Sequence, residues 1–389
     1  MIKKPVFILG AGATKACGGP LTDEILPAAL NGEIAQDGRT INVSDREELI
    51  VLSSRFLQEC FNIPDRQKKP IIEKEDCPSL PMVLSMLKRS ASSGLPIGNW
   101  EGENLIKAKR AIEYAIFAVI EAALRRIPGY RHFHHSMLEH LYQNDIEPAV
   151  ISLNYDVIID NTMFNLSEHY RPMHPPDYCV DIATQRYIDF CSGGTFGRLL
   201  KIHGSLNWLY CDSCKRLDIF ISESMRTGKA LDELYHSARF DDAYSCRGTE
   251  CRNKPACNGF VSPILITPTF TKDYENPHVY KVWSEAEKTM KSSDKAVIIG
   301  YSLPTDDVEI AMLFKRGLEH LPREQITVVE YVPGDIDKAY DQRTPLKDHP
   351  IGQRFRSLFG QDIDWHTTGF AGWLNEQQNS NGFPFNLCQ

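Results

Sequence analysis

Three short apolar segments, each running straight into a polar or glycine-rich motif, constrain how this 389-residue chain can fold. They cover residues 6–9, 149–153 and 197–202, and they lead respectively into Gly10, Asn154 and His203. Short continuous apolar runs are typical of strands that are buried in a parallel sheet. Helical segments alternate with them, and ligands bind such sheets at the carboxyl ends of the strands. The sequence therefore predicts an α/β fold with a Rossmann-like parallel sheet.

The first of these motifs, GAGAT at residues 10–14, indicates a nucleotide-binding turn. Gly10 and Gly12 allow the backbone to turn sharply and to approach a ligand closely. The N–H groups of the segment that follows can bind a phosphate. The spacing Gly-x-Gly-x-x-Lys lacks the third glycine of the usual dinucleotide fingerprint, so an ordinary glycine-rich turn is the alternative.

The segment KIHGSLNW, residues 201–208, places His203 at the end of one strand, and SLNYD, residues 152–156, places Asn154 and Asp156 at the end of another. A histidine near a ribose hydroxyl can take its proton or hold a water, and an asparagine amide can orient that water. We interpret the two segments as one site that binds a pyridine dinucleotide and breaks its glycosidic bond, with Asp156 orienting the nicotinamide ring. The alternatives are a strand-end histidine and an asparagine that only forms a turn.

Five cysteines between positions 211 and 257 predict a small metal-binding module over residues 211–258. In a long chain, clustered cysteines indicate a metal more often than disulfides. Zinc favours four thiolates in a tetrahedron, and two close pairs supply them with little chain strain. We expect a closed structural zinc site whose ligands are Cys211, Cys214, Cys251 and Cys257. Cys246 competes with the last two for a place, and free loop cysteines are the alternative.

Five motifs follow one another along most of the chain: GAGATKACGGP at 10–20, SLNYD at 152–156, KIHGSLNW at 201–208, PTFTK at 268–272 and GYSLPTDD at 300–307. Their combination resembles the sirtuin-like family of the divergent prokaryotic type, which consumes NAD and is associated with defence. The resemblance implies a sirtuin-like fold in which Asn154 and His203 are catalytic. It implies that NAD lies against Gly10, Ala11, Gly12, Thr14, Gly300 and Ser302, the last two on its adenosine half. Glu330, at a predicted strand end, is the expected acceptor for the adenine ribose.

The chain departs from protein-deacylating sirtuins near the nicotinamide ribose. Where those enzymes carry Gly-Ile-Pro-Asp-Phe-Arg, this chain has GGPLTD at residues 18–23, and Leu153 replaces the glutamine before the asparagine. The stretch that helps to bind an acyl-lysine peptide is also missing. We therefore predict an NAD hydrolase that forms nicotinamide and ADP-ribose, as a gated bacterial anti-phage or stress effector. An NAD-dependent protein deacylase and a non-catalytic NAD or ADP-ribose sensor or scaffold are the alternatives.

The expected NAD-binding domain combines residues 1–30, 146–210 and 259–378, and a helical insertion over residues 31–145 interrupts it. Apolar residues at helical spacing predict a helix over 104–127, and a second helix is expected over 132–142. The histidines of that second helix are expected to be solvated rather than bound to a metal: His132, His134, His135 and His140. Residues 379–389 are expected to form a flexible tail.

Composition narrows the class of partner. Hydrophobic residues make up 42% and charged residues 24% of the chain, as in an ordinary globular protein. The net charge of −8 argues against a general nucleic-acid-binding surface. No apolar run reaches the roughly 18 residues that a membrane span needs, so we expect a cytoplasmic protein. Constant NAD depletion would be toxic, so we expect a homo-oligomer and an activating partner protein, such as an ATPase, to gate the activity.

Overall fold

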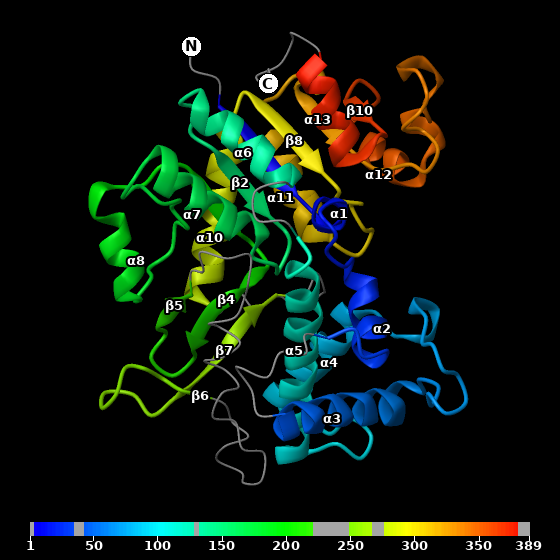
Figure 1. The fold of residues 1–389 in the computed structure, drawn as a ribbon, viewed down its shortest axis with the longest axis vertical. Coiled ribbons are helices and arrows are strands. Elements are labelled where there is room, and N and C mark those ends of the chain that lie inside the picture. The colour runs from blue at the N-terminus through cyan, green and yellow to red at the C-terminus, as the bar shows by residue number, and fades with distance from the viewer. Residues whose placement is uncertain (1–3, 35–42, 128–131, 221–248, 267–275, 380–389) are drawn as a thin grey trace. The chain divides into compact units, whose positions relative to one another are not determined.

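The computed structural model describes residues 4–34, 43–127, 132–220, 249–266 and 276–379 of the chain (Figure 1). The chain divides into two compact units. The first contains residues 1–18, 127–204 and 273–389, and the second contains residues 19–126 and 205–272. Cys246, the PTFTK motif at 268–272 and most of the expected tail lie outside the described residues.

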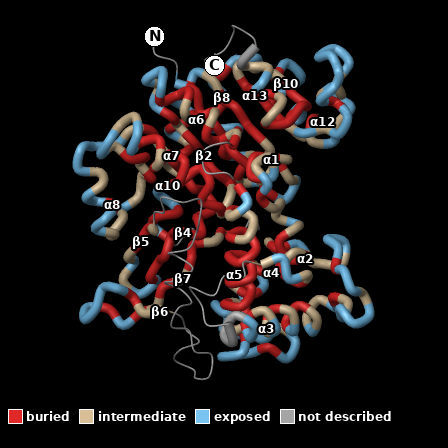
Figure 2. The backbone as a smooth tube through the Cα atoms, in the orientation of Figure 1, coloured by how far each residue is buried: buried red, intermediate tan, exposed pale blue. Residues whose placement is uncertain are grey.

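The first unit is built on a six-stranded parallel sheet with the strand order β10-β9-β8-β1-β2-β3. The strands are β1 (Pro5–Leu9), β2 (Ala149–Ser152), β3 (Arg198–Lys201), β8 (Lys295–Ile299), β9 (Ile326–Val329) and β10 (Asp364–His366). The central strands are buried almost throughout, which is why their sequences are continuous apolar runs rather than alternating ones (Figure 2). The predicted α/β class with a parallel sheet is confirmed.

The strand order reverses next to β1. From β1 the chain continues outward on one side through β2 and β3, whereas β8, on the other side of β1, begins the run through β9 and β10. In an open parallel sheet, the ends of two strands at such a reversal leave a crevice where ligands bind. The residues that follow β1 and β8 at this point are Gly10 and Gly300.

Helices connect the strands of the first unit, as parallel pairing requires. They are α1 (Ala11–Ala16), α6 (Phe133–Gln143), α7 (Ile158–Tyr170), α8 (Gln185–Phe190), α10 (Pro277–Lys291), α11 (Val308–Leu318), α12 (Pro350–Phe359) and α13 (Gly369–Asn379). The start of α10 shows how the sequence sets a boundary. The side chain of Asn276 accepts hydrogen bonds from the N–H groups of His278 and Val279, and Pro277 occupies the first turn, where no N–H is needed.

The second unit combines helices with a four-stranded sheet of order β5-β4-β7-β6. Its helices are α2 (Ile25–Leu30), α3 (Val43–Phe61), α4 (Leu80–Ser93) and α5 (Gly102–Leu124), and its strands are β4 (Gly204–Cys211), β5 (Leu217–Ile219), β6 (Thr249–Glu250) and β7 (Phe260–Leu265). Helix α5 packs against α2, α3 and α4, and most of its residues are buried (Figure 2). The predicted helix over 104–127 is therefore confirmed, as is the helix expected over 132–142, which is α6.

Short 3-10 helices complete the described elements. They are η1 (Thr22–Glu24), η2 (Lys74–Asp76), η3 (Cys191–Gly193), η5 (Arg323–Gln325), η6 (Tyr340–Gln342) and η7 (Leu346–Asp348). Among the helices that the structure describes, none is both long and apolar enough to cross a bilayer.

The histidines of α6 are buried, so the expectation that they are solvated is wrong. His132 is 4% exposed, His134 is 2% exposed, and His135 and His140 are also buried. The cause lies in tertiary packing, because α6 contacts both α7 and α13 within the first unit. Helical periodicity alone does not show that a polar-looking face will be covered by a neighbouring helix.

We expect Gly300→Ala to destabilise the protein more than Gly334→Ala. Both glycines have a positive φ, which costs any other residue about 1–2 kcal/mol. A Cβ at position 300 would also lie 2.3 Å from the backbone nitrogen of Ala13, whereas one at position 334 would meet nothing within 4 Å. Overpacking of this kind adds about 1–3 kcal/mol to the loss of unfolding free energy. Urea unfolding followed by circular dichroism measures both changes, and equal losses would contradict the proposed close contact.

Candidate functional site

Backbone contacts join the glycine turn after β1 to the end of β8. The N–H of Gly10 donates to the carbonyl of Ile299 at 2.9 Å, and the N–H of Gly12 donates to the carbonyl of Gly300 at 2.8 Å. A Cβ on Gly10 or Gly12 would lie less than 3.0 Å from residues 300–301, so side chains are excluded there. Because the N–H of Ala13 also bonds the carbonyl of Gly10, two of the amides expected to be free for a phosphate are already used.

A directed chain of hydrogen bonds links the predicted residues Thr14, Asn154 and Asp156. The Thr14 hydroxyl donates to Oδ2 of Asp156 at 2.6 Å, since a carboxylate can only accept. The Thr14 oxygen then accepts from Nδ2 of Asn154 at 2.9 Å. The structure therefore brings these three side chains together, although 142 residues separate Thr14 from Asp156 in the sequence.

This chain fixes which way the amide of Asn154 points. Its second N–H donates to the carbonyl of Gly10 at 2.9 Å, so both N–H groups hold the glycine turn. The carbonyl oxygen Oδ1 is the polar atom that remains for a ligand or a water. Asn154 is only half-buried, whereas Asp156 is buried and its second oxygen accepts the N–H of Ile158 at 3.0 Å.

His203 lies beside the same segment. Its Nδ1 is 3.0 Å from the carbonyl oxygen of Leu153, the residue before Asn154. A carbonyl can only accept, so Nδ1 carries the proton and Nε2 carries the basic lone pair of the neutral ring. The ring is buried near Trp283, whose indole N–H donates to the carbonyl of Ile202 at 2.9 Å. The imidazole and the carboxamide are thus held at the ends of neighbouring strands, β3 and β2.

A buried ion pair that was not predicted from the sequence holds the main chain at Asp156. Lys201 is 1% exposed, and its Nζ donates to Oδ2 of Asp160 at 3.0 Å and to the main-chain carbonyl of Asp156 at 2.5 Å. Tyr178 donates its hydroxyl to the other oxygen of Asp160 at 2.6 Å. The available signal was a lysine directly after two leucines of a predicted buried strand, because a lysine is almost never fully buried without a partner.

The residues predicted for the adenosine half lie at the ends of β8 and β9. Gly300 contacts the glycine turn directly, whereas Ser302 is half-buried and its main-chain carbonyl accepts from Nε of Arg354 at 2.9 Å. Glu330 is half-buried beyond the end of β9, and its carboxylate accepts the N–H of Tyr331 at 3.1 Å. Burial raises the pKa of Glu330 above its usual value despite this hydrogen bond and the nearby Arg354.

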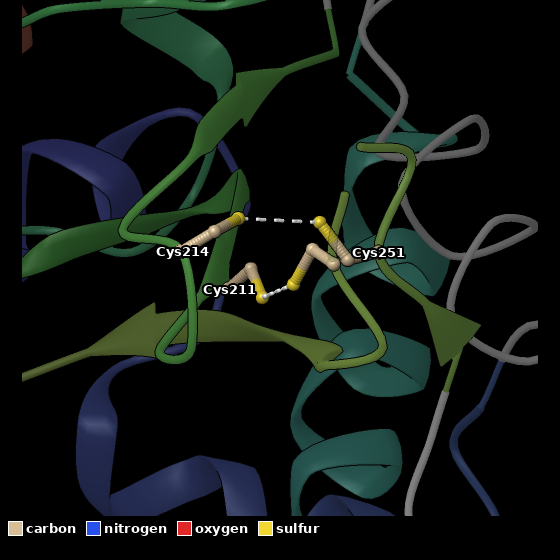
Figure 3. A group of neighbouring side chains, drawn as sticks. Cys211, Cys214 and Cys251 are labelled. Carbon is tan, nitrogen blue, oxygen red and sulfur yellow. Dashed lines mark hydrogen bonds between the residues drawn. The ribbon is translucent and has the colours of Figure 1, made fainter. Parts of the chain in front are cut away.

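The structure brings together the four predicted cysteines in the second unit. The sulfurs of Cys211 and Cys257 are 3.7 Å apart, and those of Cys214 and Cys251 are 3.5 Å apart (Figure 3). Zinc–sulfur bonds of about 2.3 Å in a tetrahedron place neighbouring sulfurs about 3.8 Å apart, so the cluster fits a zinc ion closely. The four donor atoms all lie within 4.8 Å of one another, and Figure 3 shows the labelled side chains converging. The arrangement is compatible with a closed structural site.

Comparison with known proteins shows structural similarity without sequence matches. No model of a protein family matches the chain, and no curated protein sequence matches it. A crystal structure of a Sir2 homologue with NAD is similar at a TM-score of 0.41 and 13% identity, over 95% of this chain and 85% of that one. A Sir2 homologue mutant with ADP-ribose has a TM-score of 0.39 and 13% identity, over 95% and 88% of the two chains. A Sir2 complex with p53 peptide and NAD+ has a TM-score of 0.35 and 14% identity, over 85% and 83%. Similarities at this level do not establish a shared activity.

We expect Cys214→Ser to lower the zinc content of the purified protein by about one ion per chain, because a structural zinc site needs all four ligands. Cys60→Ser is the matched control, since Cys60 is a half-buried thiol in the same unit but outside the cluster. Elemental analysis of both variants gives the metal content. Unchanged zinc in Cys214→Ser would contradict a site at these cysteines.

We expect Lys201→Met to lower the free energy of unfolding by about 3–5 kcal/mol, because it leaves the buried carboxylate of Asp160 without its cation. Adding Asp160→Asn should recover part of this loss, since an amide can still accept from Tyr178. The exposed pair of Lys281 and Asp181 supplies the control, and Lys281→Met should change stability by less than about 0.5 kcal/mol. Chemical unfolding curves of the variants distinguish the two cases; similar effects at both lysines would rule out the supporting role.

Proposed function

We propose that the protein is an NAD hydrolase, which cleaves NAD to nicotinamide and ADP-ribose. The observation that carries the proposal is the arrangement of two side chains at the ends of β2 and β3. Asn154 directs its carbonyl oxygen away from the glycine turn, and His203 keeps its basic Nε2 by donating Nδ1–H to the residue before Asn154. The sirtuin-like motifs at residues 10–20, 152–156 and 201–208 support the same substrate.

In the proposed reaction, the bond between C1′ of the ribose and the ring nitrogen of nicotinamide breaks, and that electron pair leaves with nicotinamide. The ribose acquires oxocarbenium character, and a water attacks C1′. Asn154 orients this water through Oδ1, and Nε2 of His203 accepts its proton, either directly or through a ribose hydroxyl. The products are nicotinamide, ADP-ribose and one proton. A histidine suits this step because its ordinary pKa lies close to neutral.

The remaining predicted residues hold the substrate. Gly10, Ala11 and Gly12 carry no side chain larger than a methyl group, which allows the dinucleotide to approach the backbone closely. Asp156 orients the nicotinamide amide, with Thr14 keeping its carboxylate in place. Gly300 and Ser302 take the adenosine half, and Glu330 accepts from the hydroxyls of its ribose. The four-cysteine cluster would hold structural zinc and takes no part in the reaction.

The proposal includes control of the activity. A constantly active NAD hydrolase would deplete a cell of NAD, which agrees with a role as a bacterial anti-phage or stress effector that acts on a signal. We propose that a homo-oligomer or an activating protein, such as an ATPase, supplies that control. The sequence GGPLTD at residues 18–23 lacks the aromatic and the arginine that protein deacylases carry in this motif, which supports water rather than an acyl-lysine as the acceptor.

We expect Asn154→Ala and His203→Ala each to reduce nicotinamide release from NAD at least about a hundredfold, the scale that is typical of general acid–base groups. Nicotinamide is measured with and without an acyl-lysine peptide, and with cell extract added as a source of an activator. Asn144→Ala and His320→Ala are the matched controls, since both side chains are exposed and lie on other elements of the same unit.

Three outcomes distinguish the candidate functions. Release of nicotinamide without peptide, lost in both variants, supports the hydrolase. Strict dependence on the peptide would instead make the protein a deacylase. No turnover under any condition would leave a sensor or scaffold, and full activity in both variants would remove the assigned roles of Asn154 and His203.

A further inference from the structure

A second cluster of metal-ligating side chains lies in the first unit, apart from the four cysteines. It consists of Cys17, His132 and His134, whose donor atoms all lie within 4.8 Å of one another. Cys17 is the C-cap residue of α1, His132 is the N-cap of α6, and His134 lies in the first turn of α6. The sulfur of Cys17 is 3.1 Å from Nδ1 of His134. Both imidazoles are buried, and the thiol is half-buried.

We propose that Cys17, His132 and His134 form a second metal site, for a transition metal of the zinc class. One thiolate and two imidazoles are ligands that zinc prefers, whereas calcium and magnesium prefer oxygen. Tetrahedral zinc, with bonds of about 2.3 Å to sulfur and about 2.0–2.1 Å to nitrogen, places these atoms about 3.5 Å apart. The sulfur of Cys17 and Nδ1 of His134 are 3.1 Å apart, and no two of the donor atoms are more than 4.8 Å apart. Small side-chain movements would therefore give the separation of about 3.5 Å that an ion requires.

A simple hydrogen bond between a thiol and an imidazole accounts for only part of the cluster. Such a bond explains the contact of Cys17 with His134, but it gives no reason for a third ligating atom from His132. A histidine is also an unusual N-cap, since Ser, Thr, Asp and Asn are strongly preferred there. The capping contact itself is long, at 3.3 Å from the N–H of His135 to Nδ1 of His132. A metal replaces this weak contact with a coordinate bond.

Neighbouring side chains already hold the imidazoles in position. The ring of His134 packs edge-on against the ring of Phe370 in α13, with centroids 5.2 Å apart. The rings of His132 and His134 are 5.9 Å apart, and Nε2 of His132 lies 3.5 Å from the hydroxyl of Thr162 in α7. Ligands fixed in this way lose little rotamer freedom when an ion binds. Three protein ligands leave a fourth position, which a water can take.

The site would tie α1 to α6, since its ligands come from both helices. The N–H of Cys17 donates to the carbonyl of Thr14 at 3.0 Å, so the ligand and the start of the Thr14–Asp156 chain are separated by a single turn. An ion at Cys17 would therefore restrain the segment that carries Thr14. Metal binding at Cys17, His132 and His134 requires only these side chains, whether or not the protein hydrolyses NAD.

Cobalt provides a direct test with the full-length protein prepared with one equivalent of zinc per chain, so that the four-cysteine cluster is filled and the proposed site is open to cobalt. We expect Co²⁺ titration to give one binding event with thiolate-to-cobalt charge-transfer absorption in the near ultraviolet and ligand-field bands in the visible. Cys17→Ala should abolish the charge-transfer band, and His134→Ala should weaken binding at least about tenfold, because even residues behind the ligands affect metal affinity on that scale. Elemental analysis beforehand shows whether the four-cysteine cluster retains its zinc.

The controls are a thiol and a histidine of the same unit that lie outside the cluster. Cys179→Ala and His140→Ala should bind cobalt as the unchanged protein does. Far-ultraviolet circular dichroism verifies that all four variants are folded. Absence of a cobalt–thiolate band in the unchanged protein would overturn the proposal without any variant. A band that persists in both Cys17→Ala and His134→Ala would overturn it as well, and would place the ion elsewhere.

Discussion

The first unit depends on a close approach between two backbone segments, the glycine turn after β1 and the residue that follows β8. The Gly12 N–H bonds the Gly300 carbonyl, and any Cβ at these positions would collide with the opposite backbone. The contact lies at the carboxyl ends of β1 and β8, where the strand order reverses. Ligands bind at such a reversal in open parallel sheets. The side chain of Asn154 then reaches back to the Gly10 carbonyl, which joins β2 to the same place.

Polar groups around this contact are arranged so that each hydrogen bond determines the next. The carboxylate of Asp156 makes Thr14 a donor, and Thr14 in turn must accept from Asn154. The carbonyl of Leu153 selects the tautomer of His203 in the same way. Beneath them, Lys201 fixes the main chain of Asp156 and satisfies Asp160. Buried networks of this kind keep a single geometry, because a misplaced member would leave a buried partner unsatisfied.

Much of the fold, and part of the candidate site, could be predicted from the sequence. Strands β1 and β2 are short, mostly apolar runs, and β3 carries Leu199 and Leu200 between two charged residues. The ends of these strands, and with them Gly10, Asn154 and His203, were placed from the sequence alone. The preference of zinc for two close pairs predicted a cluster around Cys211 and Cys214, and it left Cys246 competing with Cys251 and Cys257, which the structure brings to that cluster. These features are local, or they follow from the rule that parallel strands present their carboxyl ends at one edge.

The features that the sequence did not reveal depend on contacts between distant segments. Helical spacing shows which face of α6 is apolar, but the burial of His132 and His134 arises from packing against α7 and α13. Similarly, the glycine spacing predicts a turn but not that the Gly12 amide is already bonded to Gly300. Helix α1 connects these two features, because it spans only Ala11–Ala16. With the glycine turn at one end and Cys17 at the other, a helix this short cannot shift at one end without moving the other. The position of Thr14 is therefore set jointly by the contact between the glycine turn and Gly300 and by the side chains that surround Cys17.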